Sequence, residues 1–159
     1  MDTVEDFLAH AIQLEAEAAE RFGQLANAMD ASGNGQVGKL FRRLSDYSRL
    51  HLADAKARGG FREIPKLTPA QFTWPDLESP ETAAIWAADP TIGREEALEI
   101  ALEAETAGLD YYKSVLETTD DPETRILARE FVDEEKEHIV ELRKWIAAHK
   151  AGLALPVDR

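Results

Sequence analysis

Residues 121–145, DPETRILAREFVDEEKEHIVELRKW, carry the pattern of one long amphipathic helix. Asp121 and Pro122 form an N-cap and first-turn pair, which is a common way for a helix to begin. Apolar side chains then recur at the spacing of one helix face, at Ala128, Phe131, Leu142 and Trp145. The pattern predicts a helix that begins at Pro122 and ends near Gly152.

Three segments upstream show the same period. The first begins at a capping box formed by Asp2 and Glu5 and ends near Ala31, the second ends at the glycines 59 and 60, and the third covers residues 95–117. Because short, long and short connections join the four segments, the sequence predicts an all-α four-helix bundle of two antiparallel helix hairpins. At 159 residues the chain is expected to form a single domain, residues 1–159.

The connection between the hairpins, residues 61–94, is interrupted by prolines at 65, 69, 75, 80 and 90. We expect a long crossover with one short helix from Ser79 to Trp86. It also contains Phe61, Phe72 and Trp74, more aromatic surface than an irregular segment usually needs. These side chains are expected to pack on the bundle or on a partner chain, and we predict a homodimer.

Composition narrows the classes of partner. The chain has 31 acidic and 18 basic side chains, and its formal net charge of -13 would repel nucleic acid and anionic membranes. It has no cysteine, so any metal must be held by oxygen and nitrogen. Its first residues are acidic and no apolar run is long enough to span a membrane. A soluble cytoplasmic protein is expected.

Glu135 and His138 form a Glu-x-x-His pair, whose spacing brings both side chains to one helix face. Such a short motif arises often by chance, and the alternative is a solvated acidic face. Both residues, however, continue the apolar stripe of their helix. Metal-capable residues also lie on the stripes of the other three predicted helices, at Glu15, His51 and Glu105.

Burying this many ionisable groups without compensation would cost several kcal/mol each, against a total stability of about 5–15 kcal/mol. A bound cation compensates them directly, because it keeps carboxylates ionised and accepts a neutral histidine nitrogen. The sequence therefore predicts metal binding inside the bundle. The alternative is that some of these groups are exposed at helix edges.

The two hairpins are related by an internal repeat. Residues 40–51 align with residues 127–138, which pairs His51 with His138, and Glu15 aligns with Glu105 because an aromatic residue follows each by seven positions. In this register Ser48 stands where Glu135 stands in the other hairpin.

These features resemble the rubrerythrin and ferritin-like superfamily, and more closely its short members without a rubredoxin domain. The resemblance implies a ferritin-like bundle that holds two irons between Glu residues and two Glu-x-x-His motifs. By this resemblance Glu15 and Glu105 are terminal ligands, His51 and His138 are nitrogen ligands, and Glu135 is a bridge. Ser48 replaces the second bridge, which leaves the number of metals open.

Three functions follow as hypotheses. The first is a di-iron oxidoreductase that oxidises ferrous ion or reduces peroxide or dioxygen, with a separate electron donor. Manganese or zinc could replace iron. The second is a redox-silent holder or sensor of one ion, and the third is a helical interaction module. Asp54 and Glu141 follow the two histidines by three positions and are predicted to be exposed acids, with orientation of the imidazoles as the alternative. His10 is expected to face away from Glu15.

Overall fold

The computed structural model describes residues 3–74, 79–80 and 89–158. It contains four long helices, α1 (Val4–Ala31), α2 (Gly35–Arg58), α4 (Arg94–Thr118) and α5 (Pro122–Lys150). It also contains two short 3-10 helices, η1 (Pro69–Gln71) and η2 (Pro156–Asp158), and the described residues include no strand. The prediction of an all-α four-helix bundle is confirmed.

The helices begin and end close to the predicted positions. The Asp121 carboxylate accepts a hydrogen bond from the Thr124 backbone N–H, and Pro122 occupies the first turn of α5, as the sequence predicts. The predicted cap of α1 is wrong by one residue: Thr3 is the N-cap and its hydroxyl accepts from the Asp6 N–H. Between α1 and α2, Gly33 has φ 79°, a conformation that favours glycine.

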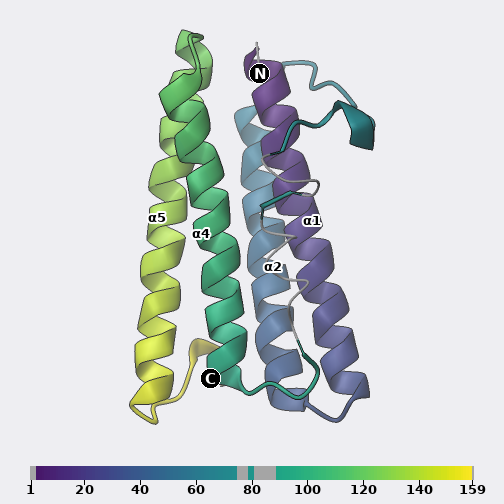
Figure 1. The fold of residues 1–159 in the computed structure, drawn as a ribbon, viewed down its shortest axis with the longest axis vertical. Helices are drawn as coiled ribbons and strands as arrows, with labels where there is room; N and C mark the ends of the chain where they lie inside the picture. The colour runs from purple at the N-terminus through teal and green to yellow at the C-terminus, as the bar shows by residue number, and fades with distance from the viewer. Residues whose placement is uncertain (1–2, 75–78, 81–88, 159) are drawn as a thin grey trace.

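The four helices form two antiparallel hairpins that lie side by side (Figure 1). One hairpin consists of α1 and α2 and the other of α4 and α5, and the connection between α2 and α4 returns along the length of the bundle (Figure 1). Helix α4 therefore runs in the same direction as α2, as the crossover predicts. None of the described helices is long and apolar enough to cross a membrane.

The core consists of two apolar clusters, one toward each end of the bundle. One includes Phe22, Phe41 and Trp145. The other includes Phe7, Tyr112 and Phe131, whose rings pack edge-on or stacked at centroid distances of 5.2–6.1 Å. Along α1, Glu15 falls between Leu14 of the second cluster and Phe22 of the first. The apolar stripe of the helix is thus interrupted by an acid in the middle of the core.

His10 of α1 binds the crossover at residues 72–74. Its Nδ1 lies 2.8 Å from the Asp6 carbonyl and must donate to it, so its Nε2 is free to accept the Thr73 backbone N–H at 3.0 Å. The rings of Phe72 and Trp74 pack edge-on against the imidazole, both with centroids at 5.0 Å. Two of the aromatic residues expected to pack on the bundle or on a partner therefore pack on the bundle.

This contact predicts a pH dependence of stability. Burial is the main cause that lowers the pKa of His10 below its usual value of 6.5, and protonated Nε2 could not accept the Thr73 N–H. Since the unfolded state binds the proton more readily, this contribution is complete above about pH 6.5 and is lost as the pH falls below it.

Urea unfolding at about pH 7.5 and about pH 5.5 measures this contribution. The free energy of unfolding of the unmodified protein should fall more between these values than that of His10→Phe, which keeps a ring but cannot titrate. Equal losses in the two proteins would show that His10 does not carry this dependence.

The remaining predictions for the crossover have different outcomes. Phe61 is fully exposed. The predicted short helix from Ser79 to Trp86 lies almost wholly outside the described residues. The homodimer stays a prediction.

Candidate metal centre

Each of the four long helices places one or two of the predicted site residues in the middle of the bundle. Glu15 comes from α1, His51 from α2, Glu105 from α4, and Glu135 and His138 from α5. The three glutamates are at most 7% exposed, and the histidine side chains are 20% and 25% exposed. The alternative that these acids lie at solvated helix edges is therefore wrong for all three.

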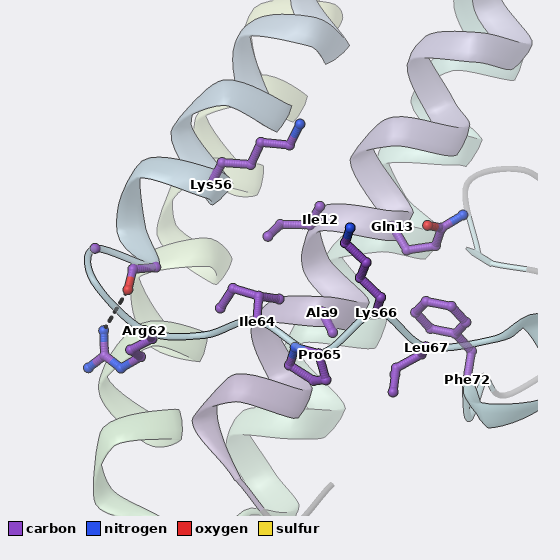
Figure 2. A pocket seen from close by; sticks show the side chains of 12 residues that line it. Ala9, Ile12, Gln13, Lys56, Arg62, Ile64, Pro65, Lys66, Leu67 and Phe72 are labelled. Carbon is purple, nitrogen blue, oxygen red and sulfur yellow. Dashed lines mark hydrogen bonds between the residues drawn. The ribbon is translucent and has the colours of Figure 1, made fainter.

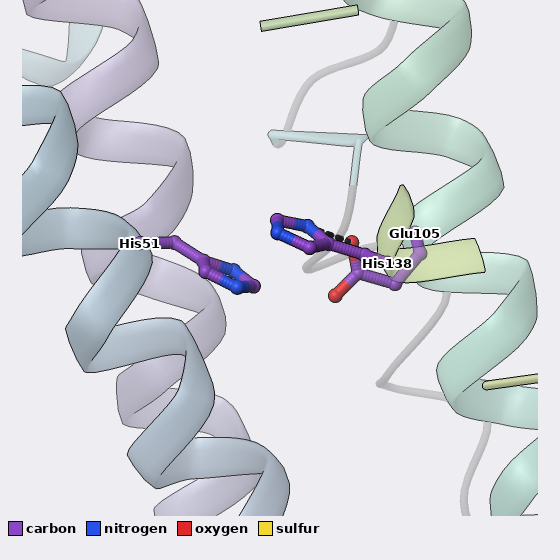
Figure 3. A group of neighbouring side chains, drawn as sticks. All are labelled: His51, Glu105 and His138. Atoms are coloured by element: carbon purple, nitrogen blue, oxygen red, sulfur yellow. Dashed lines mark ion pairs between the residues drawn. The ribbon is translucent and has the colours of Figure 1, made fainter. Parts of the chain in front are cut away.

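The five side chains form one connected cluster. His51 Nδ1 lies 3.7 Å from a Glu15 oxygen, and His138 Nδ1 lies 3.8 Å from Glu105 Oε2 and 3.7 Å from Glu135 Oε1. The two imidazoles stack with a centroid distance of 3.6 Å and an interplanar angle of 6°. Figure 3 shows His51 reaching from one hairpin toward Glu105 and His138 of the other. The cluster thus spans the interface between the hairpins.

Within this cluster, one ligand atom from each of His51, Glu105 and His138 lies within 4.8 Å of the others. His51 Nδ1, His138 Nδ1 and Glu105 Oε2 are buried and make no hydrogen bond among the described residues. Buried polar atoms are nearly always satisfied, so unpartnered atoms of this kind need another partner. Cations bound among the five side chains would supply that partner, and two imidazole nitrogens with carboxylates are a donor set that iron, manganese and zinc accept. The residues therefore fit a metal.

Neighbouring charges shift the pKa values of Glu105 and His51. Burial would raise the pKa of Glu105, but the close approach of Glu135 and His138 lowers it to about 2, so this carboxylate is ionised at neutral pH. Burial would lower the pKa of His51, but contact with Glu15 and the negative charges of Glu105 and Glu134 raise it. A proton can occupy the place of a cation at His51, so metal binding there should release it.

Tyr112 extends the cluster on the side of Glu15. Its hydroxyl lies 3.4 Å from Glu15 Oε1 and donates a long hydrogen bond to it, and its side chain is fully buried. This contact fixes one oxygen of Glu15 and leaves the other directed at His51. Tyr112 follows Glu105 by seven positions, as Phe22 follows Glu15, and the sequence favours core packing for it over a redox role beside iron. It does lie in one of the two core clusters.

Ser48 is 2% exposed and lies one turn before His51 on α2. Its burial shows that the repeat position opposite Glu135 faces the interior of the bundle. A hydroxyl carries no charge and reaches less far than a glutamate carboxylate. The hairpin of α1 and α2 thus contributes one carboxylate fewer to the cluster than the repeat would allow.

Arg58 contacts Glu134, the neighbour of Glu135, and was not among the residues predicted from the sequence. Its guanidinium forms ion pairs with Asp54 on its own helix and with Glu130 and Glu134 on α5, and it lies 5.5 Å from the centroid of the Phe131 ring. It therefore bridges the two hairpins two helical turns along α2 from His51. Two features of the sequence could have indicated these ion pairs: an arginine two helical turns after His51, and a run of acidic residues in the helix that contains Glu135.

The acids that follow the histidines have other partners. Asp54 pairs with Arg58, and Glu141 accepts a hydrogen bond from the indole N–H of Trp145 at 3.2 Å. Both are exposed, as predicted. Neither orients an imidazole.

A cavity of about 260 Å³ leads from the cluster toward the surface between α2 and α5. His51, Glu105 and His138 line its inner part. Its walls are mainly apolar, formed by Leu44, Tyr47, Leu142 and Trp145. Small molecules can therefore reach the histidines without crossing the packed core.

Comparisons with known proteins agree with this architecture. A family model described as "Ferritin-like domain" matches residues 5–150. A solved structure of a conserved protein of uncharacterized function from Magnetospirillum magnetotacticum MS-1 is 37% identical, with a TM-score of 0.64 and 97% of each chain covered. The comparison with curated proteins gave no match. Because the family model covers nearly the whole chain, the protein belongs to the ferritin-like family.

Proposed function

We propose that the protein is a non-haem iron-binding protein of the di-iron carboxylate type, which oxidises ferrous ion or reduces peroxide or dioxygen. The observation that supports this most directly is that one ligand atom from each of His51, Glu105 and His138 lies within 4.8 Å of the others. His51 Nδ1, His138 Nδ1 and Glu105 Oε2 are also buried without a hydrogen-bond partner among the described residues. The ferritin-like family adds the expectation of iron. The donor set also suits manganese and accepts zinc.

The proposed ligands divide between two ions. Glu105, Glu135 and His138 would hold the first, and Glu15 and His51 the second, with Glu135 bridging. Ferrous iron held there supplies electrons for the reduction of dioxygen or peroxide.

The protein's own residues have three tasks in this proposal. The ionised Glu105 carboxylate provides negative charge that a cation needs, and the pairing of Glu15 with Tyr112 orients the carboxylate on the other side. The apolar walls of the cavity admit small oxidants and limit water. A separate protein would supply electrons for repeated turnover, because the chain has no cysteine to hold a relay iron.

A second candidate is a redox-silent protein that holds one ion. It is favoured by the grouping of both histidines with the single carboxylate of Glu105 within 4.8 Å. The one-ion candidate is also favoured by Ser48, which stands on α2 at the repeat position of Glu135. One bridging carboxylate is therefore missing.

Ferrous oxidation distinguishes the two candidates. Iron added anaerobically, followed by peroxide or dioxygen, should be oxidised faster with the protein than without it, and the rate should rise only after more than one equivalent is bound. Glu135→Gln keeps the size of the side chain but removes the charge of the proposed bridge, so it should slow oxidation by about tenfold or more. Glu137→Gln, an exposed neighbour on α5, should leave the rate unchanged. Protein-bound iron that is oxidised no faster than free iron would support the redox-silent candidate instead.

A further inference from the structure

A second pocket lies away from the metal centre, between α1, the end of α2 and the first part of the crossover (Figure 2). Its volume is about 420 Å³. This lies within the range of roughly 300–1,000 Å³ typical of small-molecule sites. None of its lining residues belongs to the five proposed metal ligands.

The floor of this pocket is apolar. Ala9 and Ile12 of α1 contribute to it, and Ile64, Leu67 and Phe72 of the crossover complete it. The contact of Phe72 with the buried His10 ring fixes this side of the pocket to α1. An apolar surface of this kind favours a hydrocarbon chain over a small hydrated ion.

The charged side chains that line the pocket are all basic, although the chain as a whole has a net charge of -13. Arg62 is already paired with Glu123 at 3.0 Å. Lys56 and Lys66 make no ion pair with any described residue, and Figure 2 shows the two side chains on either side of Ile12. Two ammonium groups without acidic partners above an apolar floor form a local site for an anion.

We propose that this pocket binds an amphipathic carboxylate, whose hydrocarbon chain lies on the floor and whose carboxylate lies between Lys56 and Lys66. The apolar floor accounts for the chain, and the two unpaired ammonium groups account for the head group. A short anion would leave the floor unfilled, and a neutral molecule would leave the lysines without a partner. This site does not depend on the metal centre.

Calorimetric titration with octanoate tests the pairing of chain and charge. Octanoate should bind at least about tenfold more tightly than either acetate, which lacks the chain, or octanol, which lacks the charge. Octanol binding as tightly as octanoate would overturn the role of the lysines. Acetate binding as tightly would overturn the role of the floor.

Lysine variants then locate the head group. Lys56→Gln and Lys66→Gln should each weaken octanoate binding by about twofold to fivefold, the range of a surface ion pair, and Lys66→Glu should weaken it by about tenfold. Lys136→Gln is the matched control, because Lys136 is exposed on α5 and also lacks an ion pair among the described residues. Equal weakening by Lys136→Gln would show non-specific attraction and overturn the site.

Methyl NMR spectra distinguish this pocket from the cavity at the metal centre. Octanoate should shift the methyl resonances of Ile12 and Ile64, which line the pocket, and leave that of the exposed Ile126 unchanged. Shifts confined to Leu44 and Leu142 would place octanoate in the cavity beside the histidines and contradict the proposal. Such a result would leave the proposed iron binding untouched, because the metal ligands are tested by other variants.

Discussion

Chelation of bound metal is expected to lower the melting temperature of the protein by about 5–10 °C. A ligand at about 100 times its Kd stabilises the native state by about 2.7 kcal/mol, and for a chain of this size 1 kcal/mol corresponds to roughly 2–4 °C. The stabilisation has a clear structural origin, because the proposed ligands come from both hairpins, with His51 of one lying close to Glu105 and His138 of the other. Calorimetry with and without chelator, together with metal analysis of both samples, measures the shift.

Glu105→Gln should remove most of this shift. The amide has nearly the shape of the carboxylate but lacks its charge, so the variant should lose metal affinity without leaving a hole in the core. Glu103→Gln is the control, because Glu103 lies on the same helix and is exposed. If chelation removes the metal from the unmodified protein and leaves the melting temperature unchanged, the metal does not stabilise the interface between the hairpins.

Ser48→Glu is expected to tighten the weaker of two metal-binding events by on the order of tenfold or more. Ser48 is buried at the position that the repeat pairs with Glu135, so the new carboxylate would add a charged ligand on the α2 side of the cluster. The stronger event should change little, because Glu105, Glu135 and His138 remain. Anaerobic titration with ferrous ion measures both affinities.

Two further variants control this experiment. Ser48→Asp adds the same charge in a smaller side chain, which guards against the larger glutamate failing to fit its buried position. Leu50→Glu adds a negative charge at a position of α2 that is 64% exposed, so it tests whether net charge alone is responsible. Equal tightening by Leu50→Glu would remove the reason to regard Ser48 as a lost bridge.

The fold could be predicted closely from the sequence because its signals are local. The pair Asp121 and Pro122 begins α5 where the pattern indicates, and the glycines 59 and 60 follow the end of α2. The start of α1 was predicted at Asp2, whereas Thr3 caps the helix. Thr3 and Asp2 are both good caps, and adjacent candidates of this kind cannot be separated by spacing alone.

The candidate site could be located because buried acids interrupt apolar stripes. Glu15 and Glu105 stand out in this way, and both are buried. The contacts that depend on how the hairpins pack could not be predicted. The stacking of the two imidazoles and the ion pairs of Arg58 with α5 join residues that are distant in the sequence.

His10 shows a further limit of sequence patterns. The helical spacing correctly separates it from Glu15, but an isolated histidine on α1 gives no sign of its partner. That partner is the Thr73 backbone N–H in the irregular crossover, where no periodicity exists to guide a prediction. Its burial at 2% exposure depends on Phe72 and Trp74 packing over it.

Anaerobic titration of metal-free protein with ferrous ion is the decisive measurement for the proposed centre. We expect one tight and one weaker binding event per chain, because Glu105, Glu135 and His138 supply three ligands and Glu15 and His51 supply two. His51→Ala should abolish the weaker event and retain the tight one. Protein purified without a metal-affinity column that binds no ferrous ion above the level of the double variant Glu105→Gln, His138→Ala would contradict a metal centre at this cluster.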